Sequence, residues 1–233
     1  VQASLLPRQT PQIDGWEFAA RWRPALEVAG DYYDFFLCPD GRQGLVMADV
    51  SGKGMPAALF MALTRSTVRA SIGQAPMPED GGKHANRLLS EDSTDAMFVT
   101  LFYVRLDPKT GEMVYVNAGH NPPLVCRSGE SGPPERLNPT GMAQGILPDA
   151  PLEQRRVHLQ PGDFVVLYTD GVTEAIDTQR QQFGMERLAR VLVGQAGRTA
   201  TEVLAAIEDA LDAFTGTAPQ SDDCAILTAR RLG

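Results

Sequence analysis

The sequence predicts an antiparallel α+β fold. Strand-like runs rich in β-branched and aromatic residues alternate with a few well-separated helical segments. Two connections, DPKTGE at 107–112 and QPG at 160–162, have the Pro, Asp and Gly composition of tight turns. The chain has 233 residues, of which 43% are hydrophobic, and this is enough for one substantial core. Residues 1–233 are therefore expected to form a single domain.

The first part of the chain is expected to contain three strands and two helices. The strands, at 16–22, 31–38 and 44–50, are short apolar runs, two of them bounded by Gly or Asp. At 54–70 the pattern changes to a helical period, and Pro56 suits the first turn of that helix. A loop at 73–82 and a short helix at 83–92 follow. The face of helix 54–70 that is expected to be buried comprises Met55, Leu59, Ala62, Leu63, Ser66 and Ala70.

The remainder of the chain is expected to be mainly strands. Two further helices are expected at 184–195 and 199–216, and Thr199 or Thr201 could cap the second. The short turns between successive strands favour antiparallel pairing. The expected strands are 97–106, 113–119, 122–127, 152–159, 163–169 and 224–231.

Composition and charge argue against several classes of function. A formal net charge of −8 and a pI of about 4.9 disfavour a surface for nucleic acid or for an anionic membrane. No apolar run approaches the length of a membrane span. Cys38, Cys126 and Cys224 form no C-x-x-C pair, which is typical of a reducing cytoplasm and gives no zinc signature. There is also no G-x-S-x-G motif of a serine hydrolase.

Acidic residues recur where strand-like segments begin or end. Taken one at a time, each is better explained as a turn or a solvated cap, since Asp-Gly is foremost a turn dipeptide. Strand ends at one edge of a sheet can converge, however, and convergent carboxylates repel one another unless a cation lies among them. Oxygen ligands alone favour hard ions such as Mg²⁺, Ca²⁺ or Mn²⁺. The segments are AGDYYD with Asp31 and Asp34, MADVSGKG with Asp49, LYTDGVTE with Asp170 and Glu174, and QSDDCAIL with Asp222 and Asp223.

These segments, in this order and spacing, resemble the bacterial SpoIIE/RsbU-like branch of the type 2C metal-dependent protein phosphatases. The resemblance extends over nearly the whole chain, through PALEVAGDYYDFF, ADVSGKGMPAALFMA, MFVTLFYVRLDPKTGEMVYVNAGHNPPL, LQPGDFVVLYTDGVTEA and DDCAIL. It implies two packed antiparallel sheets flanked by helices. It also implies a site for two divalent ions, Mn²⁺ or Mg²⁺, at one end of the sandwich.

The resemblance also implies roles for individual residues. Asp49 would bridge the two ions, and an ion-bridging hydroxide would attack the phosphomonoester, so no side-chain nucleophile is needed. Asp223 would support the site, and Asp34 would be supporting or structural. The implied metal ligands are Asp31, Asp49, the Val50 carbonyl, Asp170 and Asp222, and the implied catalytic residues are Asp49 and Asp170.

The chain departs from eukaryotic relatives at two functional positions. Ser51 stands where they have a His proposed as general acid, and Leu26 stands where they have an Arg that grips phosphate. Lys53 is a candidate phosphate contact, although SGKG is not a phosphate-binding P-loop and a Lys in such a turn is more often solvated. His120 in NAGHNPP is better explained as structural than as an acid.

The leading functional hypothesis is a cytoplasmic Ser/Thr phosphoprotein phosphatase in bacterial signalling. Its substrate would be a small phosphorylated signalling protein of the anti-sigma-factor antagonist type. The start VQASLLPRQTP lacks an initiator Met and a signal-peptide pattern, so the domain is expected to be the C-terminal output part of a longer protein with an upstream regulatory domain. The sequence does not decide whether it forms a homodimer. The alternatives are a catalytically silent module that docks a partner, and a metal-dependent hydrolase of nucleotides or other small phosphates.

Overall fold

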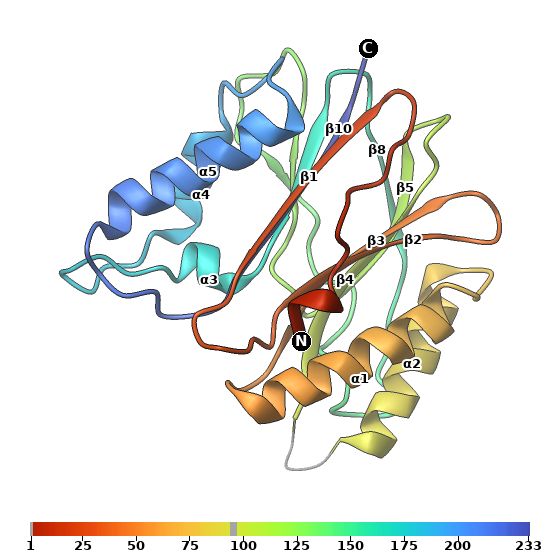
Figure 1. Cartoon of the computed structure of the whole chain (residues 1–233). Helices are drawn as coiled ribbons and strands as arrows, with labels where there is room; N and C mark the ends of the chain where they lie inside the picture. Colours follow the sequence, from red (N-terminus) through yellow and green to blue (C-terminus); the bar gives the residue numbers. More distant parts are fainter. Residues whose placement is uncertain (1, 94–96) are drawn as a thin grey trace.

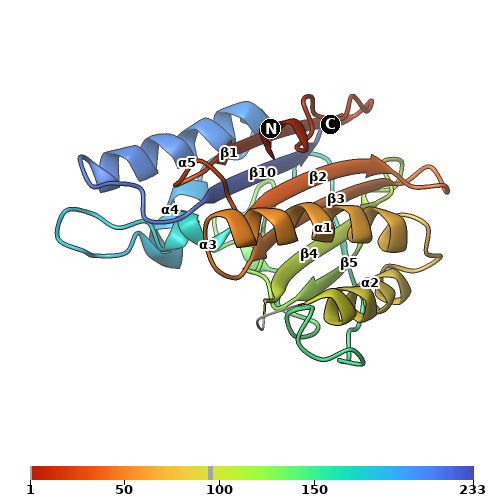
Figure 2. The same ribbon diagram turned by 60° about the horizontal axis from the view of Figure 1, so that its bottom comes forward.

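The computed structural model describes residues 2–93 and 97–233 as two stacked antiparallel sheets with helices on the outer faces (Figure 1). Sheet A has the strand order β1-β10-β9-β6-β7, and sheet B has the order β2-β3-β4-β5-β8. Helices α3, α4 and α5 lie on the sheet A side, and α1 and α2 lie on the sheet B side (Figure 2). The predicted α+β class and the two-sheet sandwich are confirmed.

Ten strands and five α-helices make up this framework in the described residues, with a short 3₁₀ helix at Gln2–Ser4. Sheet A comprises β1 (Trp16–Arg23), β10 (Cys224–Arg231), β9 (Phe164–Tyr168), β6 (Leu124–Cys126) and β7 (Glu135–Arg136). Sheet B comprises β2 (Tyr32–Leu37), β3 (Gln43–Val50), β4 (Val99–Leu106), β5 (Glu112–Ala118) and β8 (Arg155–His158). The helices are α1 (Met55–Ile72), α2 (Pro78–Asp92), α3 (Asp170–Thr173), α4 (Gly184–Leu192) and α5 (Ala200–Thr215).

The two predicted turns connect the strands in different ways. DPKTGE joins β4 to β5 as an antiparallel hairpin, with Leu106 opposite Met113. QPG follows β8, which pairs with β5 in sheet B, and precedes β9, which pairs with β10 and β6 in sheet A. The turn predicted at QPG is present, and the Asp163 N–H donates to the Gln160 carbonyl across it at 3.0 Å, but the two strands it joins do not pair with each other. A tight turn fixes only the local reversal of the chain, and here it carries the chain from one sheet to the other.

The predicted buried face of α1 was also wrong. Met55 and Leu59 are 59% and 66% exposed, whereas the buried side includes Phe60 and Met61. Apolar side chains lie all around the first half of this helix, so their spacing does not indicate which face is buried. The orientation of the helix instead agrees with two arginines of its second half, Arg65 and Arg69, because both form ion pairs with the buried Asp34 of β2.

Helix α2 begins five residues earlier than predicted. Gly81 and Gly82, which were taken as part of a loop, lie in its first half. A Cβ on Gly81 would lie 2.6 Å from the Ile72 Cα, and one on Gly82 would lie 2.5 Å from a Leu152 methyl. These glycines therefore allow α2 to approach α1 and the chain before β8 closely. Pro78 at the start of the helix and two acidic residues in its first turn set the N-terminus.

The cap of α5 follows the prediction for Thr199. Its hydroxyl accepts from the Glu202 backbone N–H, and the Glu202 carboxylate accepts from the Thr199 N–H, which completes a capping box. Such a cap stabilises a helix by about 1 kcal/mol.

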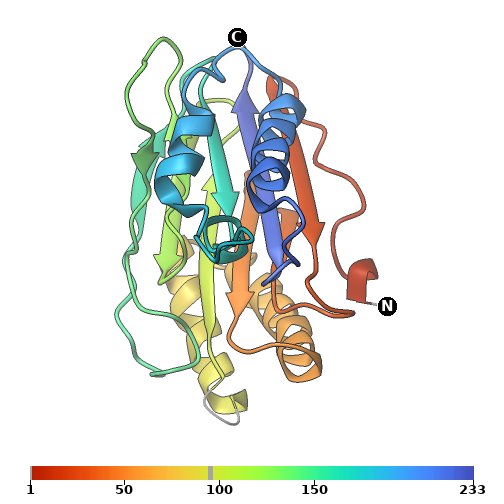
Figure 3. The same cartoon turned by 90° about the vertical axis from the view of Figure 1, so that its left-hand side faces the viewer.

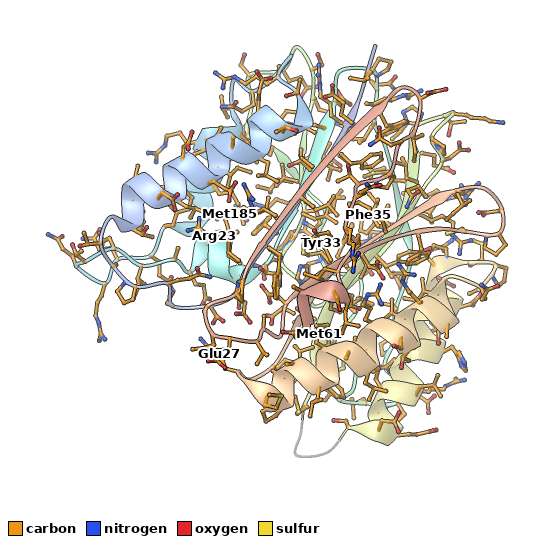
Figure 4. The ribbon with its side chains drawn as sticks, in the orientation of Figure 1. Arg23, Glu27, Tyr33, Phe35, Met61 and Met185 are labelled. Carbon is orange, nitrogen blue, oxygen red and sulfur yellow. The ribbon has the colours of Figure 1, made fainter. Side chains whose placement is uncertain are left out.

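The main core fills the space between the sheets. Phe18 of β1 makes an edge contact with Phe35 of β2 at 6.1 Å between ring centroids, and Tyr33 packs on Phe35 at 5.8 Å. Figure 4 labels Tyr33 and Phe35 in this layer. A second core lies between sheet A and helices α4 and α5. In the described part of the chain, no helix combines the length and the apolar composition that a membrane span needs.

Candidate active site

Sheet B brings Asp31 and Asp49 together at one end of the sandwich. In the β2–β3 register Tyr32 lies opposite Ala48, so the next pair along the ladder is Asp31 with Asp49. Alternate strand residues share a face, which puts Asp31 on the same side as Tyr33 in the layer between the sheets. Asp31 is only 2% exposed.

Sheet A brings Asp170 and the DD pair to the same end. Strand β9 ends just before Asp170, and its neighbour β10 begins just after Asp223. The Thr169 N–H donates to the Ala225 carbonyl at 3.1 Å and closes this end of the ladder. Gly171 permits the approach, because a Cβ there would overlap the Asp223 carbonyl oxygen. The glycine of the Asp-Gly pair is therefore required for close packing, and Asp170 starts α3.

The carboxylates of the two sheets interact electrostatically. Burial and the charge of Asp49 raise the pKa of Asp31 well above its usual range. Burial and the charge of Asp170 raise the pKa of Asp49, so the repulsion crosses from one sheet to the other. Burial and the neighbouring Asp222 raise the pKa of Asp170 to about 6. This end of the sandwich therefore favours binding of positive charge.

One side-chain cation already neutralises part of this charge. Lys53 Nζ forms an ion pair with Asp222 Oδ2 at 2.8 Å and donates to the Ser221 carbonyl at 2.9 Å. Among residues 2–93 and 97–233, no three His, Cys, Asp or Glu side chains are arranged around a single ion position. The acidic residues thus converge on one end of the molecule, and Lys53 holds Asp222 there.

Asp223 has a different set of partners from Asp222. Its two carboxylate oxygens accept hydrogen bonds from the Ala25 and Gly30 backbone N–H groups, both at 2.8 Å. These bonds fix the loop that leads into Asp31. The Val50 carbonyl lies beside this loop, 2.8 Å from the position that a Cβ on Gly30 would take.

Asp34 points away from the other candidates and binds α1. Its carboxylate accepts from Arg69 at 2.5 and 2.7 Å and lies 3.3 Å from Arg65 Nε. Asp34 is 1% exposed, so this is a buried structural contact.

Ser51 and Leu26, which stand where eukaryotic relatives have a His and an Arg, supply no charged group. The Ser51 hydroxyl accepts from the Phe98 N–H at 2.9 Å and secures a backbone connection. Leu26 is 57% exposed and contributes an apolar surface.

His120 and Thr169 connect the acidic residues to their surroundings. The His120 ring nitrogen Nδ1 lies 2.8 Å from the Thr100 hydroxyl, and Thr100 is opposite Asp49 in the β3–β4 register. Burial lowers the pKa of His120 to about 3, so its ring is neutral and cannot act as a cationic acid. Sequence reasoning missed Thr169, whose side-chain hydrogen bond to Asp31 partly offsets the rise in the Asp31 pKa that burial and Asp49 cause. Its only signal was its position immediately before Asp170.

The family assignment agrees with this geometry. The model of the stage II sporulation protein E (SpoIIE) family matches residues 39–232. The chain belongs to the SpoIIE family. Of the predicted ligands of this SpoIIE-family chain, Asp49, Val50, Asp170 and Asp222 lie inside the match, and Asp31 lies before it.

Two curated proteins and one solved structure are similar to the chain. Protein IcfG from Synechocystis is 33% identical over 259 residues, which cover 99% of this chain and 40% of IcfG. RsbU from Bacillus subtilis, named a phosphoserine phosphatase, is 33% identical over 174 residues, which cover 75% of this chain and 51% of RsbU. The SiaA-PP2C domain of Pseudomonas aeruginosa has a TM-score of 0.81 at 24% identity and covers 93% of this chain and 86% of that domain. The predicted SpoIIE/RsbU-like branch and the type 2C phosphatase fold are confirmed, and the chain spans about half or less of the two curated relatives.

Proposed function

We propose that this chain is a metal-dependent Ser/Thr phosphoprotein phosphatase that acts as the output domain of a longer bacterial signalling protein. The observation that carries the proposal is the convergence of Asp31 and Asp49 from one sheet with Asp170 and Asp222 from the other. Burial and, after it, their mutual repulsion raise the pKa of three of these carboxyls, which a purely structural cluster does not need. This argues against a catalytically silent docking module.

The oxygen donors at the acidic end of the sandwich are of the kind that the two divalent ions implied by the family resemblance prefer, although no three of these side chains surround one ion position among the described residues. Asp31 Oδ2 is buried and has no hydrogen-bond partner among the described residues, so it is available as a ligand. Asp49, Asp170, Asp222 and the Val50 carbonyl supply the further oxygen ligands that Mn²⁺ and Mg²⁺ prefer. When bound, the two ions supply Lewis-acid activation of water and of the phosphoryl group.

The protein's own groups orient the substrate around this centre. Lys53 is half exposed at the rim, with its Nζ against Asp222, and we assign it as the phosphate contact. Ion binding to Asp222 would weaken that pairing and leave Nζ free for a phosphate oxygen. The substrate is proposed to be a small phosphorylated protein of the antagonist type, in keeping with the phosphoserine phosphatase name of the relative RsbU.

Phosphate release tests this proposal. The substrates are a phosphoserine protein, p-nitrophenyl phosphate and nucleoside triphosphates, each assayed against Mn²⁺ concentration. We expect Mn²⁺-dependent release from the first two. Release from nucleotides alone would support the hydrolase of small phosphates, and no release from any substrate would support the docking module.

Substitutions connect the activity to the acidic residues. Asp49→Asn and Asp170→Asn should each lower the rate by about 10²-fold or more, because misplacing the reacting groups alone can cost that much. Asp209→Asn, at an exposed position of α5, is the matched control and should keep the wild-type rate. An active, folded Asp170→Asn protein would show that Asp-Gly serves only as a turn, since Asn-Gly makes an equally good one.

A further inference from the structure

A cavity of about 350 Å³ lies next to the candidate active site. Its lining residues come from the end of β1, from α3 and the residues after it, from the last turns of α5 and from the loop that leads to β10. Figure 3 shows the backbone of the molecule from this side. This volume lies within the range of about 300–1,000 Å³ that is usual for ligand pockets. Another cavity, of about 210 Å³, is lined by parts of 125–135, 164 and 192–196, and no candidate site residue borders it. The larger cavity is therefore the one placed to serve the reaction.

The cavity begins one residue away from two of the proposed ligands. Gly171 and Ser221 line it, and they directly adjoin Asp170 and Asp222 in the chain. Consecutive Cα atoms are about 3.8 Å apart, and an extended peptide advances about 3.3–3.6 Å per residue. A phosphoserine held at the acidic residues would therefore bring a residue one or two positions away to this cavity.

The walls of the cavity combine apolar side chains with polar groups that already have partners. Among the described lining residues the one cation, Arg23, forms an ion pair with Asp212 at 3.0 Å, and Glu208 lies 4.0 Å from its guanidinium. The Thr215 hydroxyl donates to the Leu211 carbonyl at 3.0 Å, and the Gln220 amide donates to the Arg23 carbonyl at 2.8 Å. Figure 4 labels Arg23 at the end of β1, on the side of sheet A that α5 covers. The apolar lining comprises Ala175, Ile176, Leu211, Ala218, Pro219 and Cys224.

We propose that this cavity is a specificity pocket for an apolar side chain of the phosphoprotein, one or two residues from the phosphoserine. The inference rests on the proposed phosphatase function and adds a determinant of substrate choice. Burial of a Leu-sized side chain is favourable enough to discriminate about tenfold between sequences around the phosphoserine. Arg23 and Asp212 neutralise each other and form a polar wall that does not attract a charged residue.

The test uses phosphoserine peptides that differ only next to the phosphate. Each peptide carries Leu or Gly at one of the two positions on either side of the phosphoserine, and p-nitrophenyl phosphate serves as a substrate too small to reach the cavity. Ala218→Leu fills the cavity from the loop before β10. The matched control Ala213→Leu adds the same side chain at an exposed position of α5 outside the cavity.

For the wild type we expect Leu to raise kcat/KM over Gly about tenfold at one of these positions. Ala218→Leu should reduce that ratio to about one by lowering kcat/KM for the Leu peptide to that for the Gly peptide, and Ala213→Leu should keep both the preference and the rate on p-nitrophenyl phosphate. A ratio of one at every position in the wild type, or an unchanged preference in Ala218→Leu, would overturn the pocket.

Failure of the proposed function gives a different result. A chain without phosphatase activity would release phosphate from none of these substrates. In that case isothermal titration calorimetry of peptide binding tests whether the cavity holds an apolar side chain. Tighter binding of a Leu peptide that Ala218→Leu abolishes would support the pocket, and equal binding of Leu and Gly peptides would overturn it.

Discussion

Replacing Asp34 with Ala tests how α1 is attached to the strand that follows Asp31. The Asp34 carboxylate is 1% exposed, and the Arg65 and Arg69 guanidinium groups both lie on it. The substitution leaves two cations without their shared anion. Removing one partner of a fully buried ion pair costs about 3–5 kcal/mol. Arg69 is 42% exposed and regains water contacts, so we expect a loss of about 2–3 kcal/mol here.

The assay is urea and thermal unfolding followed by circular dichroism. For a domain of this size, 1 kcal/mol corresponds to about 2–4 °C in Tm, so Asp34→Ala should lower Tm by about 4–12 °C. The control is Asp149→Ala, which breaks an ion pair with Arg87 whose partners are 82% and 60% exposed. Such an exposed pair contributes about 0–1 kcal/mol. If Asp34→Ala changed stability no more than Asp149→Ala, the assignment of Asp34 as the anchor of α1 would be refuted.

Further expectations concern titratable groups in metal-free buffer. The folded state raises the pKa of Asp170 to about 6, so its stability should fall as pH rises from about 4 to 6, and urea unfolding of Asp170→Asn should show a weaker dependence in that window. The pKa of His120 is lowered to about 3, so its imidazole NMR signals should not shift between pH 5 and 8, and a titration in that range would contradict a neutral buried ring. Burial raises the pKa of Cys126 and Cys224 to about 12, so iodoacetamide at pH 8 should label both far more slowly in folded than in unfolded protein. Equal labelling of the two states would disprove their protection.

Much of the strand framework could be predicted because strands carry a local signal. The segment 224–231 was predicted with its observed bounds, and β1 differs by one residue. WEFAARW alternates loosely between apolar and polar residues and follows Asp-Gly, and CAILTARR contains β-branched residues and follows two acidic residues. Sheet membership could not be predicted in the same way. The residues QPG form a tight turn both in a hairpin and in a connection between two sheets. Which of the two connections forms depends on how the sheets pack, and the turn sequence does not contain that information.

The errors in the helices have a common physical origin. Glycine usually indicates a loop because its backbone is flexible. Gly81 and Gly82 instead lie in a helix, where the absence of a Cβ allows a close contact with neighbouring segments. The buried face of α1 depends on Asp34, which lies on another element about thirty residues earlier. Tertiary contacts of this kind override local propensity, and a pattern read within one segment does not contain them.

The candidate site shows the same division between local signal and tertiary packing. The recurrence of Asp at strand ends and the family resemblance pointed to the residues that the structure brings to one end of the sandwich. The pairing of Lys53 with Asp222, the contacts of Asp223 with the Asp31 loop and the cavity beside Gly171 depend on side chains from distant segments. The acidic residues of the candidate site could be predicted from the sequence, whereas the residues that contact them could not.

The division of the acidic residues between two sheets makes their spacing a property of the core. Asp31 and Asp49 lie at the end of sheet B, and Asp170 and Asp222 lie just beyond the strands at the same end of sheet A, so the distance between the two groups depends on the layer that separates the sheets. That layer is filled by large side chains such as Phe18 and those of the main core. Close-packed interiors transmit changes in volume instead of absorbing them. A change in the packing between the sheets would therefore alter the repulsion between Asp49 and Asp170, although no residue of the site itself had changed.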